Sequence, residues 1–322
     1  MKKGLKRTIL FFLALSIFVF LNNSSLFSKE REGDPLLLAH RGLAQTFPME
    51  GITGEMCTAE IIHEPEHPYL ENTIPSMEAA FKEGADLVEI DIQPTKDGEF
   101  AIFHDWTLDC RTDGTGKTRD YTMDELRKLD VGYGYTADNG KTYPFRGKGV
   151  GKMPTLNEVL THFPNKEFLI HIKSNDPVEG TQLTEYLSRY SKTRMDDLSV
   201  YGGDEPIKTL KEKMPGLRAM SKETLKSCVL SYEAISWTGY IPDACKNTQI
   251  HIPEKYAPYL WGFPTKFVNR MEEVNTRVIL VAGDGNWSEG FDEESDLERI
   301  PEGYKGWIWT NRIDRIASVV KE

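Results

Sequence analysis

Short apolar runs alternate along this chain with segments whose apolar positions recur every three or four residues. The first pattern is typical of buried strands and the second of helices that cover a sheet. The apolar runs predict strands at 35–39, 85–92, 99–104, 168–172, 198–201, 217–220, 259–262, 277–281 and 306–310. The helical spacing predicts helices at 74–83, 122–129, 155–163 and 205–214.

This alternation predicts an α/β fold with a mainly parallel sheet and helical crossovers. About eight strands fit a (β/α)8 TIM barrel, and a doubly wound open sheet is the alternative. Residues 43–70 and 132–153 exceed ordinary connections, and connections that long usually carry function or are disordered. We expect the loop at 43–70, which follows the first strand, to lie over the active-site face.

The N-terminus is basic and then strongly apolar. Lys2, Lys3, Lys6 and Arg7 precede an uncharged run at 8–21. This run of 14 residues is short of the ~20 that span a bilayer, which favours an export signal over residues 1–28. An uncleaved anchor is the alternative, and residues 34–322 form the predicted barrel. We therefore expect an exported protein, periplasmic or extracellular, whose membrane contact is confined to the N-terminal segment.

Export bears on the interpretation of the four cysteines. An even number of cysteines in an oxidising compartment permits two disulfides, with three possible connectivities. We favour Cys57–Cys110 and Cys228–Cys245, because each pair would fasten a loop beside the active face. Buried free thiols are the alternative.

The balance of charge argues against one class of partner. The chain has 39 Lys and Arg residues against 50 Asp and Glu residues, which gives a net charge of −11. Binding to nucleic acid irrespective of sequence needs clustered cations, so we expect no nucleic-acid partner.

Two carboxylates share one face of the second predicted strand. Glu89 and Asp91 are two residues apart and point to one side, while Val88, Ile90 and Ile92 point to the other. Inside a barrel, two ionised carboxylates are costly without a cation, and a hard divalent ion with oxygen ligands would stabilise them. The alternative is a half-exposed strand with a solvated acidic face.

Two histidines follow apolar runs at predicted strand ends. His40 ends the first run and His104 the third, and the carboxyl ends of parallel strands face the active-site mouth of a barrel. Because imidazole titrates near neutral pH, one histidine could act as general base and the other as general acid on a phosphorus between them. Arg41 and Lys173 are candidates for binding phosphate oxygens, and His171 shares a strand face with Lys173.

These residues belong to an ordered set of motifs that runs from about Leu36 to Arg312. The set resembles that of the glycerophosphodiester phosphodiesterases, a family of phosphatidylinositol-phospholipase-C-like TIM barrels. The matching segments are His40-Arg41-Gly42, Glu71-Asn72-Thr73, Glu89-x-Asp91, Thr95-Lys96-Asp97-Gly98, His104-Asp105, Pro154-Thr155-Leu156-x-Glu158-Val159-Leu160 and Trp309-Thr310-Asn311-Arg312.

The resemblance implies a fold, a reaction and a set of roles. It implies a TIM barrel that hydrolyses glycerophosphodiesters to sn-glycerol 3-phosphate and an alcohol with the help of a divalent metal. It also implies that His40 and His104 are the acid–base pair and that Glu89 and Asp91 bind the metal, for which Mg²⁺ or Ca²⁺ is expected.

The fourth-strand motif departs from the family pattern. The family has Glu-x-Lys there, with the glutamate as a third metal ligand, whereas this chain has His171-Ile172-Lys173. A neutral imidazole in place of a carboxylate makes the site less suited to Ca²⁺ relative to Mg²⁺, Mn²⁺ or another transition ion. If His171 does not bind the metal, Glu71 or a water fills the position.

Two other functions are compatible with the same residues. A lipid phosphodiesterase of the phospholipase C or sphingomyelinase D type would need a lipid-facing surface, which some of the six tryptophans could supply. An exported protein that binds phosphodiesters without turnover is suggested by the altered Glu-x-Lys motif alone. In each case the expected partner is a small-molecule phosphodiester or its lipid counterpart.

Overall fold

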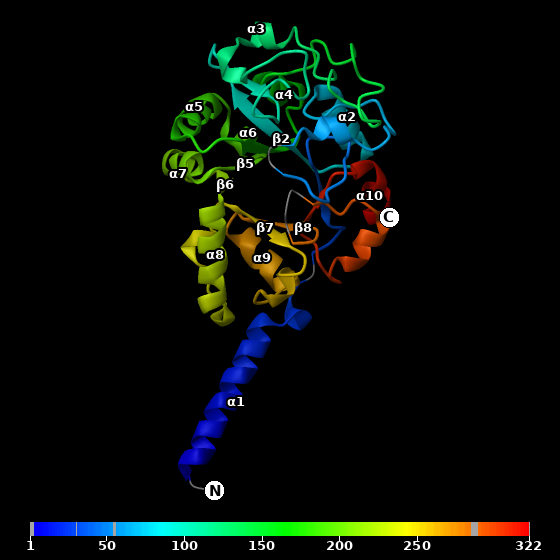
Figure 1. Cartoon of the computed structure of the whole chain (residues 1–322). Coiled ribbons are helices and arrows are strands. Elements are labelled where there is room, and N and C mark those ends of the chain that lie inside the picture. The colour runs from blue at the N-terminus through cyan, green and yellow to red at the C-terminus, as the bar shows by residue number, and fades with distance from the viewer. Residues whose placement is uncertain (1–2, 30, 54–55, 285–288, 322) are drawn as a thin grey trace.

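Eight parallel strands form a nearly closed barrel, with one helix, α1 (Lys3–Asn23), projecting from it (Figure 1). The computed structural model describes residues 3–29, 31–53, 56–284 and 289–321. Around the barrel the strands follow the order β6-β5-β4-β2-β1-β9-β8-β7. Their bounds are β1 (Leu36–Ala39), β2 (Leu87–Pro94), β4 (Glu167–Ile172), β5 (Leu198–Gly202), β6 (Arg218–Met220), β7 (Gln249–Pro253), β8 (Arg277–Val281) and β9 (Trp307–Thr310).

The gap between β6 and β7 is bridged by two hydrogen bonds at one end. The Ala219 amide donates to the Asn247 carbonyl at 3.3 Å, and Thr248 Oγ1 donates to the Ala219 carbonyl at 2.9 Å. The predicted (β/α)8 barrel is therefore confirmed, and the open doubly wound sheet is excluded.

Helices cover the outside of the barrel. Because side chains alternate along each strand, every second one packs against these helices and the others point into the barrel. Val88, Ile90 and Ile92 pack outward in the main core, whereas Leu38 and Leu169 pack inside the barrel. The covering helices are α2 (Ile74–Glu83), α4 (Leu156–His162), α5 (Pro177–Leu187), α6 (Lys192–Asp196), α7 (Asp204–Lys213), α8 (Lys222–Ile235), α9 (Thr265–Glu273) and α10 (Ile313–Val320).

The helix predicted at 74–83 is confirmed as α2. Capping residues at both ends explain why it begins and ends there. The Thr73 side chain accepts a hydrogen bond from the Ser76 amide, and Gly84 ends the helix with a positive φ of 114°. The other predicted helices, including α4 and α7, differ by a residue or a few at their ends.

One predicted strand lies outside the barrel, and another does not form. Residues 99–104 contain β3 (Phe100–Ile102), but it pairs antiparallel with β2 and is not a barrel strand, because the turn at 95–98 folds the chain straight back. Residues 259–262 form no strand; the barrel strand of this region is β7. Pro258 cannot donate to a strand ladder, and the polar Gln249 and His251 of β7 break its apolar pattern.

The long segments at 43–70 and 104–153 pack together as a cap with its own small apolar core. That core includes Ala59, Leu108, Tyr135 and Phe145. The cap also contains the short helix α3 (Met123–Leu126). The disulfide Cys57–Cys110 joins the two segments. The prediction that the loop after the first strand lies over the active-site face is confirmed, since 43–70 supplies part of the cavity wall described below.

Cys228 and Cys245 form the second disulfide, as predicted, but not for the reason expected. Cys228 lies in α8, and Cys245 lies in the connection before β7, near the amino end of that strand. This bond therefore fastens the outside of the barrel away from its mouth.

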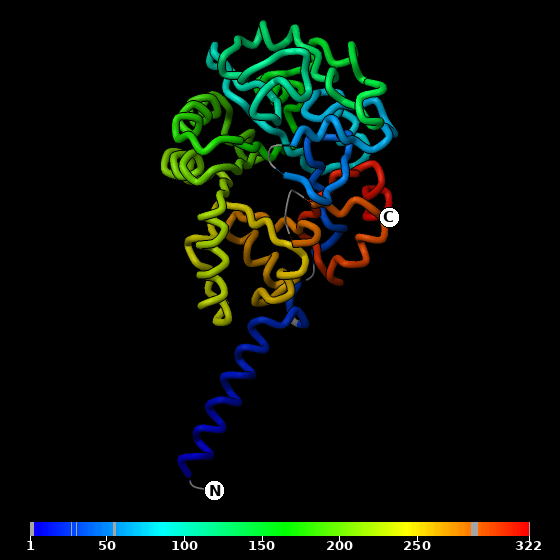
Figure 2. Tube along the Cα trace, viewed as in Figure 1, coloured from blue at the N-terminus to red at the C-terminus, as the bar shows by residue number. Residues whose placement is uncertain are grey.

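The apolar N-terminal run lies within a longer helix, α1 (Lys3–Asn23), with no buried residue. By length and composition it is the one helix among the described residues that could cross a membrane, a test that export signals also pass. Figure 2 shows that most of α1 extends away from the rest of the chain.

Candidate active site

The centre of the candidate site is a pair of carboxylates on β2. Glu89 and Asp91 are fully buried and point into the barrel, as their spacing predicted. With His171 on β4 they form a group whose potential metal-ligand atoms all lie within 4.8 Å of one another. The half-exposed acidic strand considered above is thereby excluded.

Strand register places His171 beside this pair. Asp91, His171 and Tyr201 are direct neighbours across β2, β4 and β5. His171 Nδ1 lies 2.9 Å from Asp91 Oδ1 and 3.7 Å from Glu89 Oε1. The His171 ring stacks on Tyr201 with 4.0 Å between ring centroids, and the Tyr201 hydroxyl donates to Glu89 Oε1 at 2.7 Å.

The two carboxylates differ sharply in acidity. Burial, together with the nearby charge of Asp91, raises the pKa of Glu89 to about 8. Burial alone would raise the pKa of Asp91 as well, but the charges of Lys173, His104 and Arg41 lower it well below its usual range. Lys173 Nζ lies 3.6 Å from Asp91 Oδ1. The charge of Asp91 is thus compensated by protein cations, while Glu89 lacks a counter-charge of equal strength.

His40 is held at the end of β1 by partners from the other end of the chain. Its amide donates to the Thr310 carbonyl at 3.0 Å, and its Nδ1 lies 2.6 Å from Asn311 Oδ1. The Asn311 side chain in turn donates to Asp292 at 2.9 Å. Burial, and then the charge of Arg41, lower the pKa of His40 well below its usual value.

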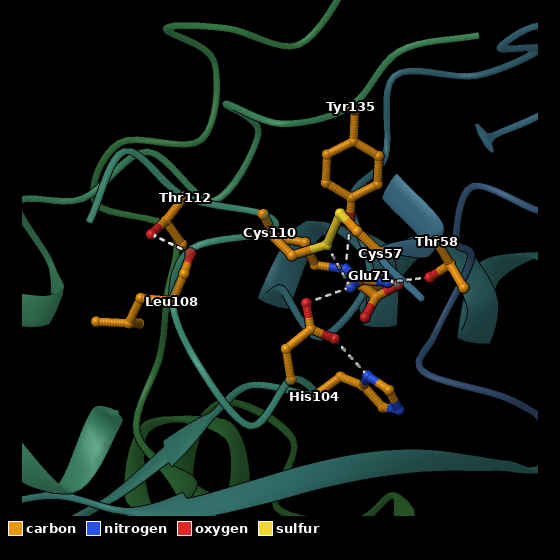
Figure 3. Close-up of a disulfide and its surroundings, with 10 residues drawn as sticks. Cys57, Thr58, Glu71, His104, Leu108, Cys110, Thr112 and Tyr135 are labelled. Atoms are coloured by element: carbon orange, nitrogen blue, oxygen red, sulfur yellow. Dashed lines mark hydrogen bonds and ion pairs between the residues drawn. A yellow bond between two sulfur atoms is a disulfide. The ribbon is translucent and has the colours of Figure 1, made fainter. Parts of the chain in front are cut away.

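His104 also has its partner at Nδ1, as His40 has, but this partner is charged. Its Nδ1 lies 2.7 Å from Asp105 Oδ1, and Asp105 is also bound by Arg111 (Figure 3). Burial alone would raise the pKa of Asp105, but Arg111 and His104 lower it. Burial, with Arg41 and Lys173, lowers the pKa of His104.

Arg111 connects this histidine to the cap. It directly follows the disulfide residue Cys110, and its Nη2 donates to Thr58 Oγ1 at 2.7 Å. The same Nη2 donates to Glu71 Oε2 at 3.2 Å, and Figure 3 shows the disulfide, Thr58 and Glu71 close together, with His104 nearby. The cap is therefore connected to His104 through Arg111 and Asp105.

Arg41 lies between His40, Asp91 and Glu71 and has a left-handed backbone conformation. Its φ is 59°, and the next residue, Gly42, must be a glycine because a Cβ there would lie 2.6 Å from Ser76 Oγ. This turn brings Arg41 Nε to 3.1 Å from His40 Nε2 and 3.3 Å from Asp91 Oδ2.

Glu71 lies outside the group of three potential metal ligands. Its carboxylate is bound by Arg41 Nη1 at 3.2 Å and by Arg111 Nη2 at 3.2 Å. Its neighbour Asn72 clamps Asp91, donating from Nδ2 to Oδ2 at 2.9 Å and accepting from the Asp91 amide at 3.1 Å.

A cavity of about 410 Å³ opens over these residues. The four residues predicted to act on a phosphate line it together with His171, whereas Glu89 and Asp91 lie buried beneath. The cap supplies the opposite wall. The lining includes His40, Arg41, His104, His171 and Lys173, with Phe47, Ile52, Met56, the disulfide Cys57–Cys110, Trp106 and Tyr201.

Four residues of the site had no role assigned from the sequence. Asn72 and Asn311 stand within the matched motifs, so the motif set itself was the signal for them. Tyr201 ends a predicted strand. Its position beside His171, on the side of the sheet that faces the barrel interior, follows only from the strand register. Arg111 had no signal besides its position after Cys110.

The tryptophans do not gather on one lipid-facing surface among the described residues. Trp307 and Trp309 are buried in the barrel, and the centroid of the Trp309 ring lies 4.8 Å from that of the His40 ring. Trp237 and Trp261 are partly buried near α8 and α9, Trp106 is 55% exposed at the cavity, and Trp287 lies outside the described residues.

Comparison with known proteins identifies the family of this chain. The model of the Glycerophosphoryl diester phosphodiesterase family matches residues 40–234, more than half of the chain. The chain is 33% identical over 138 residues to the glycerophosphodiester phosphodiesterase of Caldanaerobacter subterraneus subsp. tengcongensis, which covers 43% of this chain and 44% of that protein. It is 40% identical over 116 residues to a glycerophosphodiester phosphodiesterase of Bacillus subtilis, with 35% and 38% covered. The matched segment thus spans less than half the length of either relative.

Solved structures match over nearly the whole chain. The crystal structure of a glycerophosphodiester phosphodiesterase from Agrobacterium tumefaciens has a TM-score of 0.58 at 20% identity, covering 88% of this chain and 98% of that one. An Oleispira antarctica phosphodiesterase, solved in complex with the product sn-glycerol-3-phosphate, has a TM-score of 0.53 at 19% identity, covering 90% and 98%. At these identities the likeness establishes the shared barrel fold.

Proposed function

Since the chain belongs to the Glycerophosphoryl diester phosphodiesterase family, we propose that it hydrolyses glycerophosphodiesters to sn-glycerol 3-phosphate and an alcohol. The observation that carries this proposal is the opening of His40 and His104 onto one cavity with Arg41 and Lys173. The two cations suit the non-bridging oxygens of a phosphodiester. The two imidazoles suit the two proton transfers of hydrolysis, one from the attacking oxygen and one to the leaving oxygen.

The partners of the two imidazoles give them different roles in this proposal. Asp105 is a carboxylate on Nδ1 of His104, and it stabilises the imidazolium form that a general acid needs. Asn311 is a neutral amide beside Nδ1 of His40, and its carbonyl oxygen accepts a hydrogen bond from the protonated Nδ1. Arg41 donates to the other nitrogen, Nε2, which keeps it unprotonated as a general base requires.

The reaction then needs one bond exchange at phosphorus. His40 removes a proton from the attacking group, either water or a hydroxyl of the substrate, as its oxygen bonds to phosphorus. The bond from phosphorus to the alcohol oxygen breaks, and His104 supplies the proton which that oxygen takes up. Arg41 and Lys173 hold the remaining phosphate oxygens throughout.

The residues beneath the cavity fit a divalent cation. Glu89 Oε2 is buried and has no hydrogen-bond partner among the described residues, although it lies in a group with Asp91 and His171. We therefore assign these three as ligands and give Glu71 the role of orienting Arg41 and Arg111. A bound cation would neutralise charge on the phosphate oxygens as the reaction proceeds.

The nitrogen of His171 bears on which cation is preferred. Two carboxylates and one imidazole suit Mn²⁺ or another transition ion better than Ca²⁺ or Mg²⁺, which both prefer oxygen ligands. Burial and the charge of Lys173 lower the pKa of His171 to about 4, so the ring is neutral and able to bind metal at working pH.

An assay with defined metals tests the proposal. The full chain is stripped with a chelator, reloaded with Mg²⁺, Mn²⁺ or Ca²⁺, and given glycerophosphocholine, with release of sn-glycerol 3-phosphate followed by its enzymatic oxidation. We expect turnover with at least one metal and none in a His40→Asn/His104→Asn double variant. Tight binding of the diester without product at any metal would favour a binding protein instead. Preference for intact phospholipid would favour a lipid phosphodiesterase.

We also infer that the barrel works outside the cytoplasm. Both cysteine pairs are bonded and the described residues contain no free cysteine, a pattern that forms and persists in oxidising compartments. Reduced cysteines in protein isolated from its native host would contradict this inference.

A further inference from the structure

The last turn of α1 is bound to the outside of the barrel by two cations of α9. Lys266 Nζ donates to the carbonyls of Leu21 and Asn22 at 2.7 and 2.8 Å. Arg270 Nη2 donates to the Asn22 carbonyl at 2.8 Å. The last carbonyls of a helix have no partner within the helix and carry its negative dipole end. Two barrel cations therefore satisfy groups that α1 cannot satisfy itself.

The asparagine side chains of this turn are bound as well. Asn22 and Asn23 both donate to the Trp237 carbonyl, at 3.0 and 2.8 Å, and Arg270 Nη1 donates to Asn23 Oδ1 at 3.1 Å. Gly239 gives room for this contact, since a Cβ there would lie 2.9 Å from Asn22 Nδ2. The end of α1 thus docks into a polar site formed by the residues after α8 and by α9.

The expected cleavage point after Ser28 falls between this docking site and a second set of contacts. Asn269 donates to the Lys29 carbonyl at 3.1 Å, and Arg31 pairs with Glu272 at 2.5 Å. Cleavage after Ser28 would remove every partner of Lys266 described above. Contacts specific to a segment that is discarded would serve no purpose in the mature protein.

By length and composition, the complete helix α1 could cross a bilayer, although its uncharged run at 8–21 is shorter. The whole of α1, docked turn and basic start included, has 21 residues and extends about 31 Å at 1.5 Å per residue, close to the ~30 Å thickness of the hydrocarbon core. No residue at 8–21 is charged, and apolar side chains are exposed along its length, including Phe11, Phe12 and Phe18. Lys3, Lys6 and Arg7 form a basic start, which favours the cytoplasmic side of a membrane.

We propose that α1 is retained in the mature protein as a membrane anchor, with the barrel docked on its outer end. The inference does not depend on the proposed function. Figures 1 and 2 show α1 leaving the molecule beside α8 and α9, while the cap segment 104–153 forms the opposite end. The cap would therefore face the aqueous phase, so substrates would reach the site from water rather than from the bilayer that holds the enzyme.

Fractionation and mass measurement test retention. The full chain, carrying a C-terminal tag, is expressed in a bacterial host and its membranes are washed with alkaline carbonate. We expect the protein to remain in the membrane until detergent is added, with an intact mass that includes residues 2–28. Release by the wash, or a mass that begins between residues 24 and 30, would overturn the proposal. Activity measured on the same sample reports separately on the proposed function.

A matched pair of variants tests the docking. Lys266→Met removes the bonds to Leu21 and Asn22, whereas Lys208→Met changes an exposed lysine of α7. In detergent-solubilised protein we expect trypsin to cleave after Lys29 about tenfold faster in Lys266→Met, because proteolysis follows the population of the opened segment. The Lys208→Met variant should match the wild type. Equal rates in all three proteins would overturn the docked arrangement.

Discussion

The hydroxyl of Tyr201 donates a 2.7 Å hydrogen bond to Oε1 of Glu89, while Oε2 of the same carboxylate has no hydrogen-bond partner among the described residues. The Tyr201 ring is itself fixed by stacking on His171. One residue therefore orients two of the three potential metal ligands, although it was absent from the predicted site.

Replacing Tyr201 should weaken metal binding. Tyr201→Phe keeps the stacked ring and removes the hydrogen bond to Glu89, and loss of such a supporting bond typically costs about 10- to 100-fold in metal affinity. Calorimetric titration of the stripped protein with Mn²⁺ measures the change. Tyr256→Phe, at a tyrosine that is 54% exposed, is the control and should bind as the wild type does. Unchanged affinity in Tyr201→Phe would remove Tyr201 from the site.

The two histidines should respond differently to the leaving group. His40→Ala and His104→Ala should each lower turnover of glycerophosphocholine by about 10²-fold or more with folding intact. On a p-nitrophenyl diester, whose alcohol leaves without a proton, His104→Ala should lose far less, while His40→Ala should lose as much as before. Steady-state rates and thermal melts check both points. A reversed pattern would exchange the assigned roles, and near-normal rates in both variants would refute them.

The two disulfides should separate stability from activity. Loop closure over 53 and 17 residues corresponds to about 4 and about 3 kcal/mol of stability. Cys57→Ser/Cys110→Ser should also lower kcat, because Arg111 next to Cys110 binds Asp105, which orients His104. Cys228→Ser/Cys245→Ser should lower the melting temperature and leave kcat unchanged well below it. Equal kcat in both variants would show that the cap does not position His104.

A carboxylate at position 171 should change the metal preference. His171→Glu adds an anionic oxygen beside Glu89 and Asp91, which favours hard ions over borderline ones. We expect the ratio of Ca²⁺ affinity to Mn²⁺ affinity to rise about tenfold in competitive titrations. His162→Glu, at an exposed histidine outside the barrel, should leave the ratio unchanged. No change in either variant would mean that His171 does not bind the metal.

The metal-free protein should lose stability as the pH rises toward 8. Burial and the charge of Asp91 raise the pKa of Glu89 to about 8, above the ~4.3 of an unfolded chain. The folded protein therefore binds more protons between these values, so the contribution of Glu89 falls as pH rises through this window. Melting temperatures from pH 5 to 8 should show this decline without metal, and saturating Mg²⁺ or Mn²⁺ should reduce it. A flat profile without metal would contradict the assigned acidity.

Local patterns in the sequence predicted much of the fold because they depend on neighbouring residues. The caps at Thr73 and Gly84 fix α2, and alternation along β2 turns Glu89 and Asp91 inward. The missed strand β7 shows where this reasoning fails. Its polar residues face the barrel interior and interrupt the apolar pattern, whereas the apolar residues at 259–262, which predicted a strand, lie in none of the barrel strands.

The sequence by itself determined that a barrel would carry His40, Glu89 and Asp91 at its mouth, because strand period and strand ends are local properties. Only the tertiary structure decided their partners. Register across β2, β4 and β5 aligned Asp91, His171 and Tyr201, and barrel closure brought Asn311 to His40 across 271 positions. Spacing along a chain carries no information on which distant strands become neighbours, since packing of the whole core makes that choice.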